Sequence, residues 1–215
     1  YGTPTMSDEQ WQQNLETAFK MQIPHISSYA LTVEPKTSLD NKIRKKQRLP
    51  VNEEQSARQF KILMALMQQN GYEQYEISNF AKPGHYAIHN TNYWLGKKYL
   101  GLGPSAHSFN LHSRRWNVAN NINYIESLGR GTLPFEEENL TEAQKTNELI
   151  MTSLRTQWGL NLDALSPSSV LALKESLQHI DPAYYRLHNN ILKLTEEGKL
   201  FADGIAAELF VEEST

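Results

Sequence analysis

Residues 52–77 read NEEQSARQFKILMALMQQNGYEQYEI, and their pattern predicts a helix followed by a strand. Asn52 and Gln55 have the spacing of a capping box, and Gly71 stands where a left-handed residue ends a helix. Residues 72–77 then alternate as a strand does. Between the two helix ends, apolar residues recur at helical spacing: Ala57, Phe60, Leu63, Met64 and Met67.

The residues before this unit have the same order of elements. Ser7 and Gln10 form a second capping box at the start of a predicted helix, and Pro24 ends it. Residues 25–33 are rich in small, aromatic and β-branched types, so they are predicted to form a strand. Such β-α-β alternation predicts parallel strands covered by helices, enough for part of a barrel. The structure of the basic segment 34–50 stays open between a long loop and a short helix.

The residues that follow complete the first module and lead into a second one. Residues 99–104 are expected to form a strand with close backbone approach, and residues 118–128 a helix that ends at Gly129. After the acidic run Glu136-Glu137-Glu138, a shift in composition is interpreted as a linker. We therefore expect two domains, residues 1–135 and residues 136–215.

The second module is expected to be small, mainly helical and winged-helix-like. Thr141 and Gln144 form a third capping box, and the helix that they begin should stop before Gly159. The predicted elements after it are helices at 168–178, 182–188 and 200–210, with a short strand or wing at 191–194.

Composition excludes several classes of protein. The chain of 215 residues has no cysteine, which excludes disulfides and thiolate metal sites within it. Its net charge of -3 does not favour a nucleic-acid partner, and the predicted helix 168–178 has only Lys174 beside Glu175, so no basic recognition helix is present. There is no apolar run long enough for a membrane span and no secretory leader, so a cytoplasmic protein is expected.

Histidines gather in one stretch of the chain. Four of the seven, His85, His89, His107 and His112, fall among aromatic residues. Imidazoles amid aromatic rings suit a flat aromatic ligand or a metal, but surface loops and core packing give the same pattern. His85 and His89 are predicted to lie in a loop, which matches no zinc signature and makes metal hydrolysis the weaker hypothesis.

Several segments resemble a known family in order and spacing. The central ones are YEISNFAKPG at 75–84, HNTNYW at 89–94 and YLGLGPSAHS at 99–108, and YGTP at 1–4 and SYALTVEP at 28–35 agree as well. Together they resemble the HemW branch of the oxygen-independent coproporphyrinogen oxidase family, which are radical SAM proteins. The resemblance covers essentially the whole chain and identifies it as a C-terminal part of such a protein.

The resemblance implies an α/β fold: the C-terminal part of a partial TIM-like barrel, followed by the winged-helix-like domain. Full-length relatives are expected to hold a 4Fe-4S cluster on three cysteines, with S-adenosylmethionine on the fourth iron. Since this chain has no cysteine, it is expected to be inactive alone. Ala30 and His107 match contacts to S-adenosylmethionine, although the oxidases have an aliphatic residue at the position of His107.

The HNxxYW signature distinguishes the HemW branch. It implies His89 as a heme iron ligand, with Tyr93 and Trp94 covering the porphyrin faces. The alternative is that Asn90 caps a turn and Trp94 plugs the barrel mouth. Three residues at a predicted strand end form a second tier of site candidates, with strand-end capping as their alternative role: Tyr75, Glu76 and Asn79.

Two functions follow from the resemblance. The first is a heme chaperone that binds heme and delivers it to respiratory proteins, and that in full length carries the cluster and S-adenosylmethionine. The second is an enzyme of porphyrin biosynthesis, an oxygen-independent coproporphyrinogen III oxidase that decarboxylates propionate side chains to give protoporphyrinogen IX. The oxidases lack the HNxxYW motif, which favours the chaperone. No catalytic residue is assigned.

Overall fold

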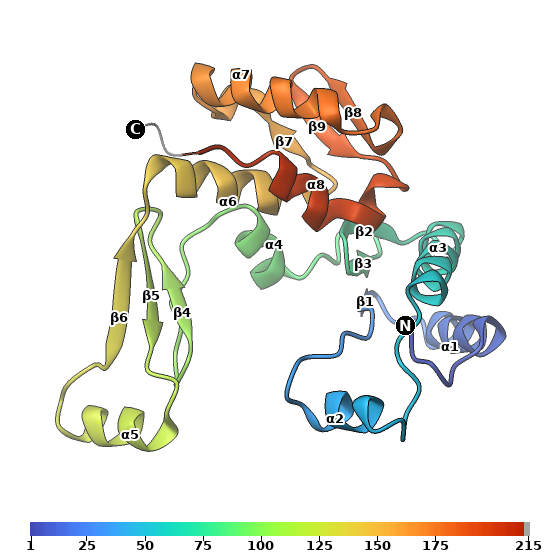
Figure 1. The fold of residues 1–215 in the computed structure, drawn as a ribbon, viewed down its shortest axis with the longest axis horizontal. Helices are drawn as coiled ribbons and strands as arrows, with labels where there is room; N and C mark the ends of the chain where they lie inside the picture. The colour runs from blue at the N-terminus through green and yellow to red at the C-terminus, as the bar shows by residue number, and fades with distance from the viewer. Residues whose placement is uncertain (213–215) are drawn as a thin grey trace. The chain divides into compact units, whose positions relative to one another are not determined.

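The computed structural model describes residues 1–212, which form two compact units, one of residues 1–86 and one that begins at Ala87 (Figure 1). Each unit mixes helices with one or more three-stranded sheets. The first unit contains α1 (Asp8–Lys20), β1 (His25–Ser27), α2 (Ser38–Arg44), α3 (Glu53–Gln69), β2 (Glu73–Glu76) and β3 (Asn79–Ala81).

The sheet of the first unit is antiparallel, with the strand order β1-β3-β2. Parallel strands were predicted, and β3 was not predicted as a strand at all. The cause is a tight turn at residues 77–78, which folds β3 back between β2 and β1. β1 and β2 therefore run in the same direction but do not touch as neighbours. Within residues 1–86 the sheet is open and no barrel closes.

One parallel pairing lies beside this sheet. The backbone nitrogen of Tyr1 donates to the carbonyl of Tyr29 at 2.8 Å, and Leu31 N–H donates to the carbonyl of Tyr1 at 2.8 Å. This staggered pattern is that of parallel strands. The predicted strand 25–33 is thus regular only at His25–Ser27, while its second half is extended backbone held by residue 1.

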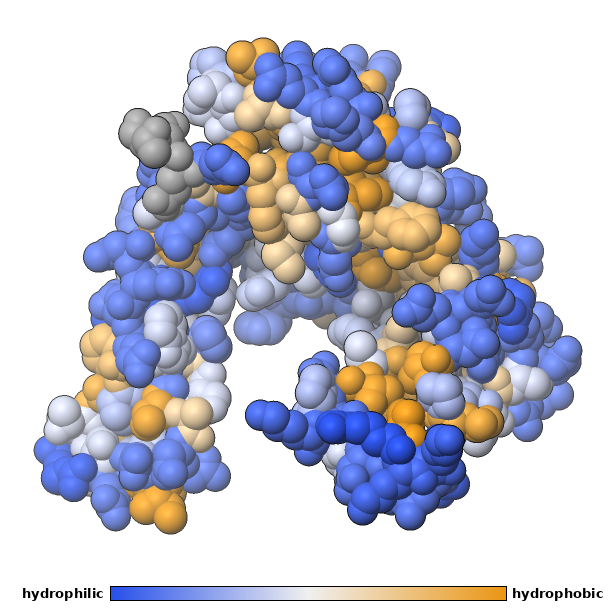
Figure 2. All heavy atoms as spheres, viewed as in Figure 1, coloured by the Kyte–Doolittle hydropathy of each residue, from blue (hydrophilic) through white to orange (hydrophobic). Residues whose placement is uncertain are grey.

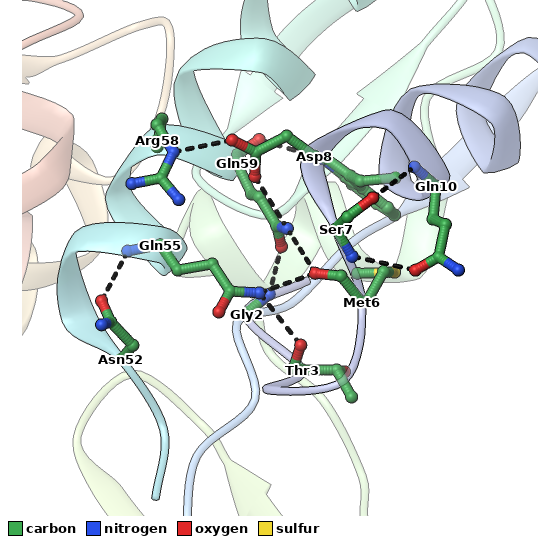
Figure 3. Close-up of polar contacts among 11 residues, drawn as sticks. Gly2, Thr3, Met6, Ser7, Asp8, Gln10, Asn52, Gln55, Arg58 and Gln59 are labelled. Atoms are coloured by element: carbon green, nitrogen blue, oxygen red, sulfur yellow. Dashed lines mark hydrogen bonds and ion pairs between the residues drawn. The ribbon is translucent and has the colours of Figure 1, made fainter. Parts of the chain in front are cut away.

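Helix α3 satisfies the backbone of the turn before α1 through two glutamines (Figure 3). Gln59 is fully buried; its side-chain oxygen accepts from Gly2 N–H at 2.8 Å, and its side-chain nitrogen donates to the Met6 carbonyl at 3.2 Å. Gln55 donates to the carbonyls of Thr3 and Met6 at 3.0 and 2.8 Å. A buried turn without such partners would be costly, so α3 fixes this turn.

The segment 34–50, whose structure the sequence left open, contains the short helix α2. Thr37 caps it by accepting from Asp40 N–H at 3.2 Å. Figure 2 shows hydrophilic side chains on the outer side of α2 and hydrophobic ones beside it. The apolar side chains Leu31, Leu39, Ile43, Leu49 and Val51 line a cavity of about 380 Å³.

The second unit contains two further antiparallel sheets, β4-β5-β6 and β7-β9-β8. Its helices and strands are α4 (Ile88–Trp94), β4 (His107–Phe109), β5 (Ser113–Asn117), α5 (Asn121–Gly129), β6 (Phe135–Asn139), α6 (Glu142–Leu154), β7 (Leu160–Asn161), α7 (Pro167–Ser176), β8 (Tyr185–His188), β9 (Ile191–Leu194) and α8 (Ala202–Glu208). One buried core lies among α6, α7, α8 and the last sheet: Ile150, Leu154, Leu160, Leu162, Leu173, Leu177, Ile180, Leu192, Ile205, Ala206 and Leu209.

The acidic run 136–138 lies in a strand, and of the linker expected after it only Leu140 stands between β6 and the N-cap of α6 at Thr141. The run forms the middle of β6, where Glu137 pairs with Arg115 and Glu138 with Arg114 across the sheet. Glu137 also accepts from the Ser113 hydroxyl at 2.6 Å. Opposite charges on facing strands explain why an acidic run is stable in this strand. The compact units divide after Tyr86, while the assignment of residues 1–135 and 136–215 to two family domains stays a prediction.

The predicted helix at 182–188 is wrong. Pro182–Tyr184 form one 3-10 turn, and Tyr185–His188 form strand β8, which pairs with β9. Asn189 and Asn190 join the two strands with positive φ angles of 49° and 59°. Two consecutive asparagines in this conformation make the two-residue hairpin turn that fits the twist of the strands.

Three other elements differ in extent. Residues 99–104 form no strand and contribute one isolated bridge, from Tyr99 to Phe109. The helix expected at 118–128 begins at Asn121, because the side chain of Asn120 caps it. The last helix begins at Ala202, after a 3-10 turn at Gly198–Phe201.

Replacing Gln59 with alanine should lower the free energy of unfolding by about 1–3 kcal/mol, because Gly2 N–H would stay buried without its partner. Urea unfolding followed by circular dichroism measures this. Gln68→Ala, at an exposed position on the same helix, is the matched control and should change stability by less than about 0.5 kcal/mol. Equal effects of the two substitutions would contradict the role of Gln59.

Candidate functional site

The HNTNYW segment lies on a helix, α4, and not in the loop that was predicted. The helix is hard to see in the sequence because its N-cap, Ala87, makes no side-chain capping bond. Its end is better marked, since Leu95 is the C-cap and Gly96 follows with φ of 61°. None of the residues of α4 is buried, so the helix has no core of its own.

His89 and Tyr93 lie on one exposed face of α4. They are four residues apart, which places them one above the other on a helix. His89 is exposed, and within residues 1–212 no group hydrogen-bonds to its imidazole. Tyr93 is 46% exposed. An open imidazole and an open ring therefore share one surface.

A row of aromatic rings connects α4 with β4. The Trp94 and Tyr93 rings meet edge to face at 5.2 Å, Tyr93 lies 5.7 Å from Tyr99, and Tyr99 lies 6.0 Å from Phe109. Burial, and next the neighbouring Tyr93, raise the pKa of the Tyr99 hydroxyl above its ordinary value. Tyr99 is therefore partly removed from water, and the row is a packed unit. Tyr93, between Trp94 and Tyr99, is the exposed ring of the row and lies one helical turn from His89.

His107 lies elsewhere in the second unit. It begins β4, is exposed, and its ring lies 6.2 Å from that of Trp116. It lines a cavity of about 490 Å³, together with Trp116, Val118, Pro134 and Phe135 among others, whose lining does not include His89, Tyr93 or Trp94. His85 belongs to the first unit, and His112 is exposed in the turn before β5. Within the second unit, the cavity beside His107 is thus not shared by His89.

Gly101 explains the glycine pattern before His107. A side-chain carbon added at Gly101 would lie 2.1 Å from the carbonyl oxygen of His107, which no other residue type tolerates. The predicted close backbone approach is therefore present, although the predicted strand is not. It sets the path of the chain into β4.

A buried polar network lies at the strand ends of the first unit. Glu76 and Asn79 are 2% and 3% exposed, and the Asn79 side-chain nitrogen donates to the Glu76 carboxylate. The Ser27 hydroxyl donates to the side-chain oxygen of Asn79. Tyr75 is fully buried, and its hydroxyl lies 2.9 Å from His25 Nε2. The network therefore joins β1, β2 and β3.

His25 and Ser27 were missed from the sequence. Both belong to β1, whose register places Ser27 opposite Asn79 and His25 opposite Ala81. No local pattern marks this pairing, because it depends on β3 folding back. Ala30, which was predicted as a cofactor contact, is exposed in the extended segment after β1 and lies between the two residues that bond to residue 1.

Among residues 1–212, no three histidine, aspartate or glutamate side chains converge to hold an ion. A heme iron needs only one or two axial ligands from the protein, so a single imidazole such as that of His89 suffices as one of them. Likewise, none of the helices in the described residues has the length and apolar character needed to cross a membrane.

Comparison with solved structures defines the class of fold. The chain matches the structure titled coproporphyrinogen III oxidase (HemN) from Escherichia coli, a radical SAM enzyme, with a TM-score of 0.77 over 98% of this chain and 53% of that chain. At 16% identity the match shows the fold alone. The described fold is thus the mixed α/β fold of that radical SAM structure.

Curated proteins give the family, while no family model matches. A protein named heme chaperone HemW from Bacillus subtilis is 32% identical in an alignment that covers 95% of this chain. A protein of the same name from Mycobacterium tuberculosis is 30% identical in an alignment that covers 97% of this chain. A zebrafish protein, radical S-adenosyl methionine domain-containing protein 1, mitochondrial, is 26% identical over 99% of the chain. The chain spans about half the length of these relatives, 52–56%. It belongs to the HemW-like radical SAM family, as its motifs predicted.

The residues present do not fit an iron-sulfur cluster. A radical SAM cluster is held by cysteine thiolates, and this chain of 215 residues has no cysteine. The chain therefore supplies no thiolate to a cluster.

The pH dependence of stability should report on His25. Burial lowers the pKa of His25 below its ordinary 6.5, and the Glu76 carboxylate opposes this shift. The unfolded chain thus binds a proton more readily, so the stability that His25 confers is complete above pH 6.5 and falls as the pH drops below it. His25→Gln, which removes the titration, should lose less stability on acidification from about pH 7 to about pH 5.

Thermal unfolding midpoints of both proteins across this range measure the effect. Glutamine can still hydrogen-bond to the Tyr75 hydroxyl, so a general loss of structure is not expected. Parallel profiles of the two proteins would contradict the prediction.

Proposed function

We propose that the protein is a heme-binding chaperone of the HemW kind, in which His89 is an axial ligand of the heme iron. The observation that carries this proposal is the exposed imidazole of His89, which has no hydrogen-bond partner among residues 1–212, one helical turn from the exposed ring of Tyr93. Neutral imidazole nitrogen is a common ligand of heme iron.

The neighbouring rings support a porphyrin as the cargo. A porphyrin is flat and largely apolar, and exposed aromatic rings offer it faces and edges for stacking. Tyr93 is the exposed member of the ring row and would cover the porphyrin. Trp94 is half-buried and would contact the cargo less directly, supporting Tyr93 from the side.

We assign S-adenosylmethionine contacts to the backbone at Ala30 and to His107, by their match to the family motifs. In the longer relatives this cofactor and a 4Fe-4S cluster would control heme transfer, and respiratory proteins would receive the heme. The buried network of Tyr75, Glu76 and Asn79 would hold the strand ends beside this cofactor, since its polar groups bond to one another.

The winged-helix-like assignment of the last part of the chain is also a proposal. It is supported by the β8–β9 hairpin, which has the form of a wing, and by α6 and α7, which pack in one core with that sheet. The family domains at 1–135 and 136–215 would then meet within β6.

Titration of hemin into the intact protein tests whether His89 is a ligand of the heme iron. His89→Ala should shift or weaken the Soret band and lower hemin affinity by more than the roughly 10–100-fold that loss of a supporting partner costs at a metal site. His112→Ala, at another exposed histidine of the same unit, is the matched control and should bind as the unchanged protein does. An unchanged spectrum in His89→Ala would remove the ligand role.

A turnover assay tests the function against its alternative, the oxidase. The intact protein, reconstituted with cluster and S-adenosylmethionine, should release no carbon dioxide from coproporphyrinogen III above the level of a blank without protein. Release of two carbon dioxide molecules per porphyrinogen would make the protein an oxidase and overturn the chaperone proposal. The likeness in fold to an oxidase carries no activity by itself.

A further inference from the structure

Helix α4 is held in place by contacts outside itself. It is seven residues long, buries none of them, and has no side-chain bond at its N-cap. A helix this short is not stable alone, so its orientation depends on what its side chains touch. On one side Tyr93 contacts the ring row, and on the other Trp94 contacts Arg155.

Arg155 connects α4 with two other helices. It is the C-cap of α6, its guanidinium carbon lies 5.3 Å from the centre of the Trp94 ring, and its Nη1 forms an ion pair with Asp203 of α8. The Arg155 side chain is 18% exposed, so the contact with the ring is mostly shielded from water. A planar guanidinium can face a ring and pair with a carboxylate at once, which an ammonium group does less well.

Helix α4 and Arg155 contain buried polar atoms that make no hydrogen bond within the described residues. Thr91 Oγ1, Trp94 Nε1 and Arg155 Nε are all buried, and none has a hydrogen-bond partner among residues 1–212. Buried polar groups are nearly always paired, because leaving one unpaired costs stability. None of these three atoms holds α4 to Arg155 by a hydrogen bond; the interactions that Arg155 makes here are the cation–π contact with Trp94 and the ion pair with Asp203.

We propose that Arg155 is a positioning residue for the His89 site. By holding Trp94 on one side of α4 while Asp203 holds its guanidinium, Arg155 sets how α4 presents His89 to its ligand. The inference rests on the proposed function of His89. Arg155 itself touches neither the iron nor the porphyrin.

Hemin titration of the intact protein carrying Arg155→Met tests this role. Methionine keeps much of the aliphatic bulk but removes the charge and the planar group. Hemin affinity should fall roughly 2- to 30-fold, the range that corresponds to a lost cation–π contact, and the Soret band should move toward that of His89→Ala. Arg155→Lys, which keeps the charge for Asp203, should recover part of the affinity.

The matched control is Arg130→Met, which removes an arginine of the same unit whose ion pair with Glu126 lies away from α4. Its hemin spectrum should be unchanged. A merely structural role of Arg155 would lower the thermal unfolding midpoint and leave the spectrum of the folded protein as it is, which would overturn the inference.

The results for His89→Ala, Arg155→Met and Asp203→Asn together separate the possible outcomes. If His89→Ala leaves the spectrum unchanged, the proposed function fails and this inference falls with it. If His89→Ala alters the spectrum but Arg155→Met does not, only the inference fails. Should Arg155→Met not fold, Asp203→Asn removes the exposed end of the ion pair and should shift the spectrum in the same direction by a smaller amount; no shift would contradict the inference.

Discussion

The candidate site depends on one constraint: α4 has no buried side chain and must be fixed from outside. Tyr93 packs toward Tyr99, and Trp94 packs toward Arg155. These contacts involve Tyr93 and Trp94, while His89 stays exposed.

Local chemistry made part of the fold predictable. The capping boxes at Ser7 and Thr141 are present as predicted, because each involves groups only three residues apart. Pairings between distant segments were not predictable in this way. The fold-back of β3 and the strand character of the acidic β6 depend on partners elsewhere in the chain. The hairpin at Asn189 was different, since its two asparagines were a local signal that was overlooked.

The candidate site shows the same division. The HNxxYW motif singled out His89 and Tyr93, which lie on α4, and Gly101 indicated a close backbone approach. Composition and spacing could not find the partners that hold these residues. Arg155 lies 61 positions after Trp94 in the sequence, and Asn79 lies 52 positions after Ser27. Contacts at such separations are decided by the packed fold and leave no mark in a short window of sequence.

The polar groups at the strand ends of the first unit and those on α4 differ in how they are paired, and the contrast bears on the proposed function. In the first unit Glu76, Asn79 and Ser27 satisfy one another, which is how buried polar groups confer rigidity. On α4 the imidazole of His89 and the indole N–H of Trp94 have no partner among residues 1–212. A paired network of this kind can orient a neighbouring site. An exposed nitrogen without a partner is open to a ligand, and we therefore propose the ligand role for α4 and the supporting role for the strand ends.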